Sequence, residues 1–224
     1  MKNLIKKLVE TYGPSGDEEQ IRKVIKNEIK DYVDNIEVDT LGNLIAFKKG
    51  KKDKNIMLAA HMDEIGLIAN HIDEDGFVRF DRVGGISPHM LLGARVLFNG
   101  QTPGVIDKEG QLESIKKLNY DKLYIDIGAS SKEEAEEKVS LGDTASYYRE
   151  FQDLGQRVTA KSLDDRIGCV TLIETLKEVD KPLYNTYFVF TTQEEVGTRG
   201  SKVAAYNIEP DLGLAVDVTL TGDM

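Results

Sequence analysis

One stretch, residues 187–200, constrains the fold more than any other, because it joins an uncharged run to a pair of carboxylates. Its sequence is YFVFTTQEEVGTRG. A continuous apolar run that ends in a glycine-containing turn predicts a buried β-strand. Ligands in open α/β sheets bind outside the carboxyl ends of the strands. Glu194 and Glu195 therefore lie where chemistry is expected.

The two glutamates are adjacent, and neighbouring side chains on an extended chain point to opposite sides. They are thus poorly placed to act as a facing acid/base pair on one bond. They can instead do two different jobs, with one as a metal ligand and the other as a base beside the metal. On this stretch alone, a pair of solvated loop glutamates explains the pattern equally well.

Two more apolar runs of the same texture also end on residues that can bind a metal ion. The run 56–60 is followed by His61, and the run 212–216 is followed by Asp217. Another acidic site, Asp164-Asp165, lies where a loop enters a helical pattern. Each feature alone is weak, since an Asp after a strand is often only a helix cap. Together they predict that several ligands converge on one edge of a sheet.

The predicted ligand set indicates the kind of metal. One histidine with several carboxylates suits Zn, Co or Mn. The carboxylates are too many for one tetrahedral ion, and they favour a two-metal site. In the pattern His61-Met62-Asp63, the imidazole is expected to bind the ion while the Asp63 carboxylate holds its other nitrogen. His71 and His89 fall in a hairpin and a loop, where surface positions are the simpler interpretation.

The pattern of helical periodicity, buried strands and turns along the chain predicts an α/β domain with a β-rich insertion. Segments 1–65 and 161–224 mix helical periodicity with buried strands. Between them, 66–160 carries short β-like runs separated by turns, which predicts a small barrel or sandwich. The expected helices are 4–12, a helix capped by Ser15 whose apolar face runs from Ile21 to Val33, 165–179 and 201–206. The expected β-runs are 36–47, 56–60, 66–72, 77–80, 94–98, 104–106, 122–127, 186–192 and 212–216. Ser15–Glu18 and Ser131–Glu134 both match the capping box that opens a helix.

Composition excludes several classes of function. The formal net charge of −10 gives no indication of nucleic-acid binding. No apolar run reaches 18 residues, so no membrane span is expected, and the charged start does not resemble a signal peptide. The single cysteine, Cys169, lies in a helical pattern and is expected to fill the core. A reducing cytoplasm fits this cysteine usage best.

Four motifs of the chain resemble those of one known family of metalloaminopeptidases, which is called the tetrahedral (TET), glutamyl-aminopeptidase or FrvX-like family. The motifs are AHMDEIG at 60–66, AKSLDDRIG at 160–168, TQEEVG at 192–197 and AVD at 215–217. They occur in the family's order across the chain. The resemblance implies a zinc-peptidase-like mixed sheet flanked by helices, and it implies that 66–160 is a dimerisation domain. It also implies homo-oligomers, commonly dodecamers built from dimers.

The resemblance also implies roles for individual residues. His61 and Asp217 would bind one divalent ion, Zn or Co, and Asp164 would bridge it to a second ion bound by Glu195. Glu194 would be the general base, and Asp63 would orient His61. The peptide bond between Asp164 and the next residue would be cis. The predicted activity is hydrolysis of N-terminal residues from peptides, with two metal ions per subunit.

One family feature has no counterpart here. Family members continue for about another third of their length and supply a final histidine on the second metal, whereas no histidine follows His89 in this chain. The sequence therefore resembles a truncated family member. The alternatives are a related metal-dependent amide hydrolase such as a carboxypeptidase or deacylase, a glycoside hydrolase, and an inactive assembly subunit.

Overall fold

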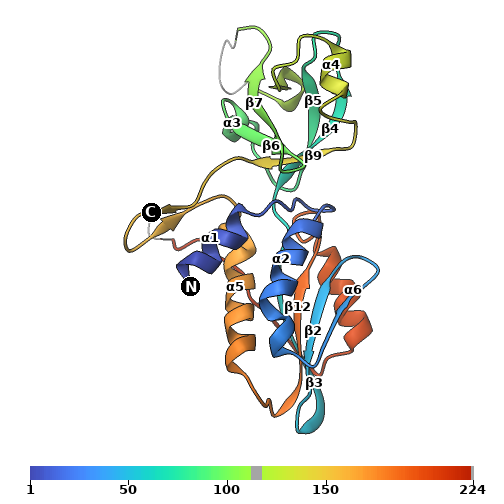
Figure 1. The fold of residues 1–224 in the computed structure, drawn as a ribbon, viewed down its shortest axis with the longest axis vertical. Helices are drawn as coiled ribbons and strands as arrows, with labels where there is room; N and C mark the ends of the chain where they lie inside the picture. Colours follow the sequence, from blue (N-terminus) through green and yellow to red (C-terminus); the bar gives the residue numbers. More distant parts are fainter. Residues whose placement is uncertain (112–117, 223–224) are drawn as a thin grey trace. The chain divides into compact units, whose positions relative to one another are not determined.

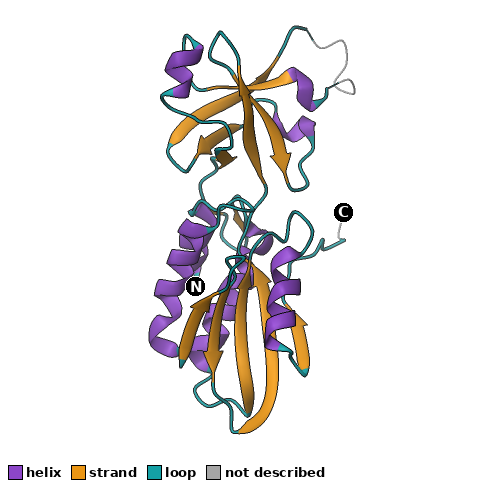
Figure 2. Cartoon of the chain, turned by 90° about the vertical axis from the view of Figure 1, so that its right-hand side faces the viewer, coloured by secondary structure: helices purple, strands orange, loops and turns teal. Residues whose placement is uncertain are grey.

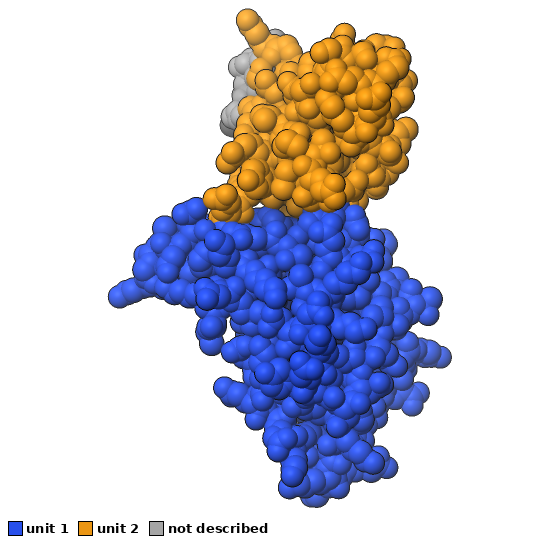
Figure 3. Space-filling view, viewed as in Figure 1, with its two compact units in different colours: residues 1–64, 151–224 blue, residues 65–150 orange. Residues whose placement is uncertain are grey.

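The chain forms two compact units in the computed structural model, which describes residues 1–111 and 118–222. Unit 1 joins residues 1–64 to the segment that begins at Phe151, and unit 2 is the stretch Ile65–Glu150 between them (Figure 3). The insertion therefore ends at Glu150 rather than at the predicted residue 160. Residues 151–160 instead carry a small hairpin of unit 1, formed by β10 (Gln152–Asp153) and β11 (Val158–Thr159).

Unit 1 is built on a five-stranded mixed sheet in the order β1-β2-β12-β3-β13. The strands β12, β3 and β13 are parallel to one another, whereas β2 is antiparallel to both of its neighbours. β12 and the second half of β3 are buried or partly buried because helices cover both faces of the sheet, whereas the first three residues of β3 are exposed. The bounds are β1 Asn35–Val38, β2 Leu44–Lys48, β3 Lys52–His61, β12 Tyr184–Thr191 and β13 Leu212–Ala215.

Helices lie on both faces of this sheet (Figures 1 and 2). On one face are α1 (Lys2–Glu10), α2 (Glu19–Ile29) and α5 (Leu163–Glu178), whose apolar residues pack on the sheet. On the other face is α6 (Arg199–Ile208), which packs on a second, smaller cluster. A short 3-10 turn, η1 (Lys30–Tyr32), follows α2. The predicted α/β class with a mixed sheet flanked by helices is confirmed.

Unit 2 is a closed antiparallel barrel in the order β4-β5-β8-β7-β6-β9. The sequence predicted five of these strands and missed β9. The strands are β4 Gly66–Ile72, β5 Val78–Val83, β6 Arg95–Phe98, β7 Thr102–Lys108, β8 Leu123–Asp126 and β9 Thr144–Tyr147. The short helical pieces are α3 (Pro88–Leu91), η3 (Tyr120–Lys122) and α4 (Lys132–Glu136). Closure leaves no unpaired strand edge.

The two predicted capping boxes have different outcomes. Ser131 caps α4, because its hydroxyl accepts a hydrogen bond from the Glu134 amide at 3.3 Å. The box at Ser15–Glu18 is wrong: α2 begins at Glu19, its N-cap is Glu18, and no side-chain bond caps it. The side chains of Ser15 and Glu18 bind elsewhere in unit 1. Among the described helices, none is both long and apolar enough to cross a bilayer.

Candidate metal centre

The candidate site lies at the carboxyl ends of the three parallel strands of unit 1. His61 is the last residue of β3 and pairs in register with Thr191, the last residue of β12. On the other side of β3, Ala215 pairs with Ala59, so that Asp217 follows close to His61. The parallel register therefore places ligands from distant parts of the sequence at one edge of the sheet.

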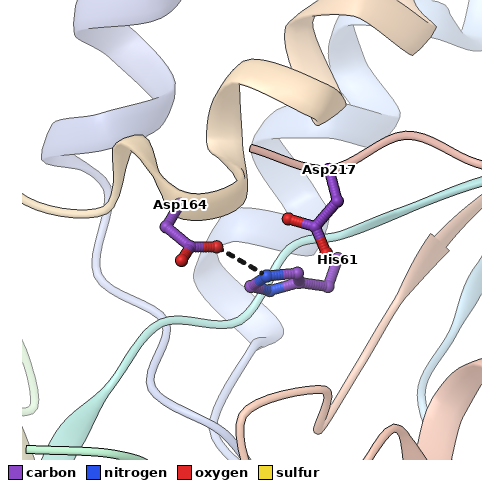
Figure 4. A group of neighbouring side chains, drawn as sticks. All are labelled: His61, Asp164 and Asp217. Carbon is purple, nitrogen blue, oxygen red and sulfur yellow. Dashed lines mark hydrogen bonds and ion pairs between the residues drawn. The ribbon is translucent and has the colours of Figure 1, made fainter. Parts of the chain in front are cut away.

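Three side chains meet there, as Figure 4 shows: His61, Asp164 and Asp217. One potential ligand atom from each lies within 4.8 Å of the other two. His61 Nε2 is 3.0 Å from Asp164 Oδ1. The imidazole is only 3% exposed, whereas the Asp164 carboxylate is 61% exposed. A rigid buried ligand thus faces carboxylates that solvent, and an ion, can reach.

Asp63 holds the imidazole from the opposite side. His61 Nδ1 lies 3.2 Å from the Asp63 carbonyl oxygen and 3.4 Å from its Oδ1. Nδ1 is therefore the nitrogen that carries the proton donated to Asp63, which leaves Nε2 for the cluster. Burial alone would raise the pKa of Asp63, but the bonds from His61, Ser15 and the Glu194 amide lower it overall. Asp63 is thus a permanent anion beneath the ligand.

Glu194 and Glu195 follow β12 in a turn rather than in an extended strand. β12 ends at Thr191, and Gln193 has a left-handed φ of 53°. The strand alternation used to interpret the pair from sequence therefore does not reach them. Glu194 Oε2 lies 4.0 Å from His61 Nε2, which places this carboxylate beside the cluster.

The electrostatics of the cluster are those of an anionic site. Burial, reinforced by Asp164, Asp63 and Glu194, raises the pKa of Glu195 to about 7, although His61 opposes the rise. Burial likewise raises the pKa of Glu194. The pKa of His61 rises to about 9, because the surrounding carboxylates outweigh its burial. Near neutral pH and without a cation, His61 holds a proton and Glu195 is partly protonated, and a bound cation would displace these protons.

The donor set fits a divalent transition metal ion. One imidazole nitrogen with carboxylate oxygens is the ligation that Zn and Co accept. Asp164 reaches the cluster from the start of α5, where it and the next residue have non-helical backbone angles. The Asp164–Asp165 peptide bond is cis, as the resemblance implied.

Residues close to Asp63 and Asp164 in the sequence form a buried ionic network, which the sequence patterns did not predict. Glu64 accepts from Lys161 Nζ at 2.6 and 2.7 Å and also from the Ser162 hydroxyl. Arg166, fully buried, donates to the carbonyls of Leu8 and Thr11 at 2.7 and 3.2 Å. Glu64, Lys161, Ser162 and Arg166 all belong to the AHMDEIG and AKSLDDRIG motifs, so the motifs could have pointed to this network. The charge of these residues gave no indication that they are buried.

The remaining candidates lie outside the cluster. His71 and His89 are exposed side chains of unit 2. Cys169 is fully buried in the core of unit 1, as expected, and its thiol donates to the His61 carbonyl at 3.1 Å. Burial raises the pKa of this thiol, so Cys169 is not a nucleophile in the folded chain.

Comparison with known proteins gives a consistent family. Residues 42–224 match the family model described as M42 glutamyl aminopeptidase. A protein of Acetivibrio thermocellus with a provisional aminopeptidase name is 51% identical over 223 residues, which is 100% of this chain and 67% of the relative. The chain thus spans about two thirds of the length of the curated relatives it matches.

Solved structures agree in fold. The aminopeptidase APDkam598 of Desulfurococcus kamchatkensis superposes with a TM-score of 0.94 at 41% identity, covering 99% of this chain and 64% of that one. The Pyrococcus horikoshii TET1 peptidase, described as assembling into a tetrahedron or a large octahedral shell, gives 0.89 at 40% identity over 100% and 72%. A Thermotoga maritima structure titled endoglucanase gives 0.87 at 39% identity over 98% and 67%.

Proposed function

The chain belongs to the M42 glutamyl aminopeptidase family, and we propose on this basis that it is the site-bearing part of a dinuclear metal-dependent aminopeptidase. Its substrates would be peptides, from which it removes N-terminal residues. One observation carries the proposal: ligand atoms of His61, Asp164 and Asp217 converge within 4.8 Å at the carboxyl edge of the sheet. Such convergence is what a metal-dependent hydrolase requires and a purely structural unit does not.

We assign the ligands as follows. His61 and Asp217 would hold a first ion, Glu195 would hold a second, and Asp164 would be a ligand shared by both. The pKa of Glu195 is raised by burial and by the neighbouring carboxylates, and this supports the assignment because such negative surroundings favour a cation. Zn or Co suits this donor set. Bound there, the two ions supply Lewis-acid polarisation of the scissile carbonyl and make a water more acidic.

Glu194 is proposed as the general base. Its carboxylate is 32% exposed, so that a water can reach it, and it lies 4.0 Å from His61 Nε2. Burial raises its pKa towards the working pH, which suits a group that accepts a proton from the attacking water and returns it to the leaving amine. Asp63 contributes by fixing the orientation of His61, with Nδ1 towards Asp63 and Nε2 towards the cluster.

We further propose that the protein is a homo-oligomer, with unit 2 as its dimerisation domain and dimers assembling into a dodecamer. Support comes from the TET1 peptidase, whose structure is described as a tetrahedral or octahedral assembly. The proposed compartment is the cytoplasm, in agreement with a single buried cysteine.

The first experiment measures metal stoichiometry after dialysis against trace zinc or cobalt, for the chain and for Glu194→Gln. We expect Glu194→Gln to keep the metal content of the wild type and to lose turnover of peptides with free N-termini. Wild-type turnover by Glu194→Gln would overturn the assignment of the base. Absence of bound metal in the wild-type chain would overturn the proposed site.

A substrate panel separates the proposal from its rivals. Aminopeptidase activity requires a free N-terminus, whereas a carboxypeptidase or deacylase also cleaves blocked peptides. One structural neighbour is described as an endoglucanase, which makes a glycoside hydrolase the second candidate. A glycosidase needs two carboxyls facing each other across the sugar, about 5–10 Å apart. Cleavage of a β-glucan with no cleavage of peptides would favour that candidate, and oligomers that bind metal without any turnover would indicate an assembly subunit.

A further inference from the structure

Four successive backbone amides after β12, those of residues 192–195, each donate to a side chain from another part of unit 1. These amides lie in a turn, where no strand partner accepts them. The acceptors come from three segments that are distant in sequence. We refer to these three side chains, Glu18, Asn43 and Asp63, as the acceptor cradle.

Asn43 holds the first amide. Its Oδ1 accepts from Thr192 N at 3.0 Å and from the Thr192 hydroxyl at 3.3 Å. Its Nδ2 donates to Asp39 Oδ2 at 2.7 Å and to Gly200 O at 2.9 Å, so that both ends of the amide group are fixed. The packing is close, because a Cβ at Gly200 would lie 2.3 Å from Asn43 Oδ1. Asn43 is completely buried, and its bonds to Thr192 and Gly200 are buried with it, whereas its bond to Asp39 is partly exposed.

Glu18 holds the second amide. Its Oε1 accepts from Gln193 N at 3.1 Å and from Gly16 N at 2.8 Å. Only 2% of Glu18 is exposed, which is unusual for a glutamate. Gln193 has a left-handed φ of 53°, and a residue other than glycine keeps this conformation only where its surroundings impose it. The Glu18 bond is one such constraint.

Asp63 holds the last two amides. Its Oδ1 accepts from Glu194 N at 3.0 Å, and its Oδ2 accepts from Glu195 N at 3.2 Å. The Ser15 hydroxyl donates to Oδ2 at 2.5 Å and fixes the carboxylate from the far side. The same carboxylate faces His61, so it ties the turn of residues 192–195 to the imidazole of the cluster.

We propose that Glu18 and Asn43 are positioning residues, which act with Asp63 to set the turn that carries Glu194 and Glu195. The inference rests on the proposed function for the roles of those two glutamates, but the cradle itself does not. Amides that point into buried acceptors fix the backbone, and a fixed backbone leaves the side chains of residues 194 and 195 only rotamer freedom. Binding and catalytic groups are most effective when their supporting contacts hold them in this way.

The first test measures hydrogen exchange of the 192–198 segment in the wild type and in Glu18→Met. Met removes the acceptor while keeping the length of the side chain. We expect slow exchange of this segment in the wild type and roughly tenfold faster exchange in Glu18→Met, with β12 unchanged. Glu18→Gln keeps an acceptor oxygen and is expected to restore slow exchange. Glu28→Met, in the helix that Glu18 precedes and without a bond to the turn, is the control.

The second test uses cobalt binding, followed by absorbance, in the same variants. Glu18→Met is expected to lower the affinity for the ion assigned to Glu195 by about 10- to 100-fold and to leave the affinity for the other ion unchanged. A general structural defect would lower the affinity for both ions together. Asn43→Ala provides a second route to the same readouts if Glu18→Met does not fold.

The outcomes separate the two proposals. Rapid exchange of the 192–198 segment in the wild type, or unchanged exchange in both variants, overturns the cradle. Faster exchange with unchanged binding of both ions overturns the positioning role. Slow exchange in a wild-type chain that binds no second ion supports the cradle and overturns the ligand role proposed for Glu195.

Discussion

The two units of this chain build their interiors in opposite ways. The core of unit 2 contains aliphatic and aromatic side chains, and its described residues bury no charged group. Their buried polar groups are the side chains of Thr144 and Ser146 and the hydroxyl of Tyr147. Unit 1 has a comparable apolar core but also buries charges beneath the strand ends. These charges are Glu18, His61, Asp63, Glu64, Asp165 and Arg166. A further buried charge, Lys48, lies at the other end of the sheet, where it pairs in register with Thr186 near the start of β12.

The difference shows which forces each unit depends on. A closed barrel with an apolar interior is stabilised by burial of hydrophobic surface, which is non-directional and tolerates small changes of shape. Buried ions recover the cost of desolvation only if their partners have good geometry. Unit 1 accepts this cost where the loops carrying the candidate ligands must be held. We therefore expect polar substitutions to affect unit 1 and apolar substitutions to affect unit 2.

The largest effect is expected from Arg166→Met. The guanidinium donates to the carbonyls of Leu8 and Thr11 and lies 3.8 Å from Glu64. Removing one member of a buried ionic network costs about 3–5 kcal/mol. Hydrogen exchange resolved by peptide should show unit 1 opening more easily while the barrel of unit 2 keeps its protection. Equal loss in both units would contradict the separation between them.

A smaller effect is expected from Asp63→Asn. An asparagine has one acceptor oxygen in place of two. Its NH₂ group would face either the Ser15 hydroxyl or one of the amides of Glu194 and Glu195, and that donor would lose its acceptor. Losing a hydrogen bond to a charged group costs about 1.5–3 kcal/mol. Urea unfolding should show this loss in unit 1. Metal affinity should fall as well, because the carboxylate charge beside His61 Nδ1 is lost although the Asp63 carbonyl remains as an acceptor. An unchanged affinity would refute a role for that charge.

The corresponding test of the barrel is Ile125→Val, which removes one methylene from a fully buried site in β8. We expect a loss of about 0.5–1.5 kcal/mol, confined to unit 2. Metal content should not change, because the substitution leaves every hydrogen bond of unit 1 intact. A change in metal binding would show that the two units are energetically coupled.

Hydrophobic periodicity and the residues at strand ends predicted the elements of the fold and part of the candidate site. They did not predict hydrogen bonds between side chains and backbone groups that are distant in sequence. The buried strands, the inserted barrel and the convergence of His61 with Asp217 all follow from local patterns. The acceptor cradle does not, since Ser15–Glu18 also matches a helix cap and Asn43 also suits a hairpin turn. Each local motif is satisfied equally well by a local bond or by a distant one, and only the fold decides between them.

The smallest effects compare two serines with the same local pattern, Ser131 in unit 2 and Ser15 in unit 1. Ser131→Ala removes the cap of a short exposed helix, and a loss of about 0.5–1 kcal/mol is expected with no other consequence. Ser15→Ala should cost somewhat more, about 1.5 kcal/mol, because one hydroxyl donor to the Asp63 carboxylate is lost while the backbone amide donors remain. The difference lies in the readout: Ser15→Ala frees Asp63 on one side, so it should speed exchange at residues 194 and 195, and Ser131→Ala should not. Identical exchange in the two variants would mean that Ser15 only shapes its own loop, and that the Asp63 carboxylate holds the turn without it.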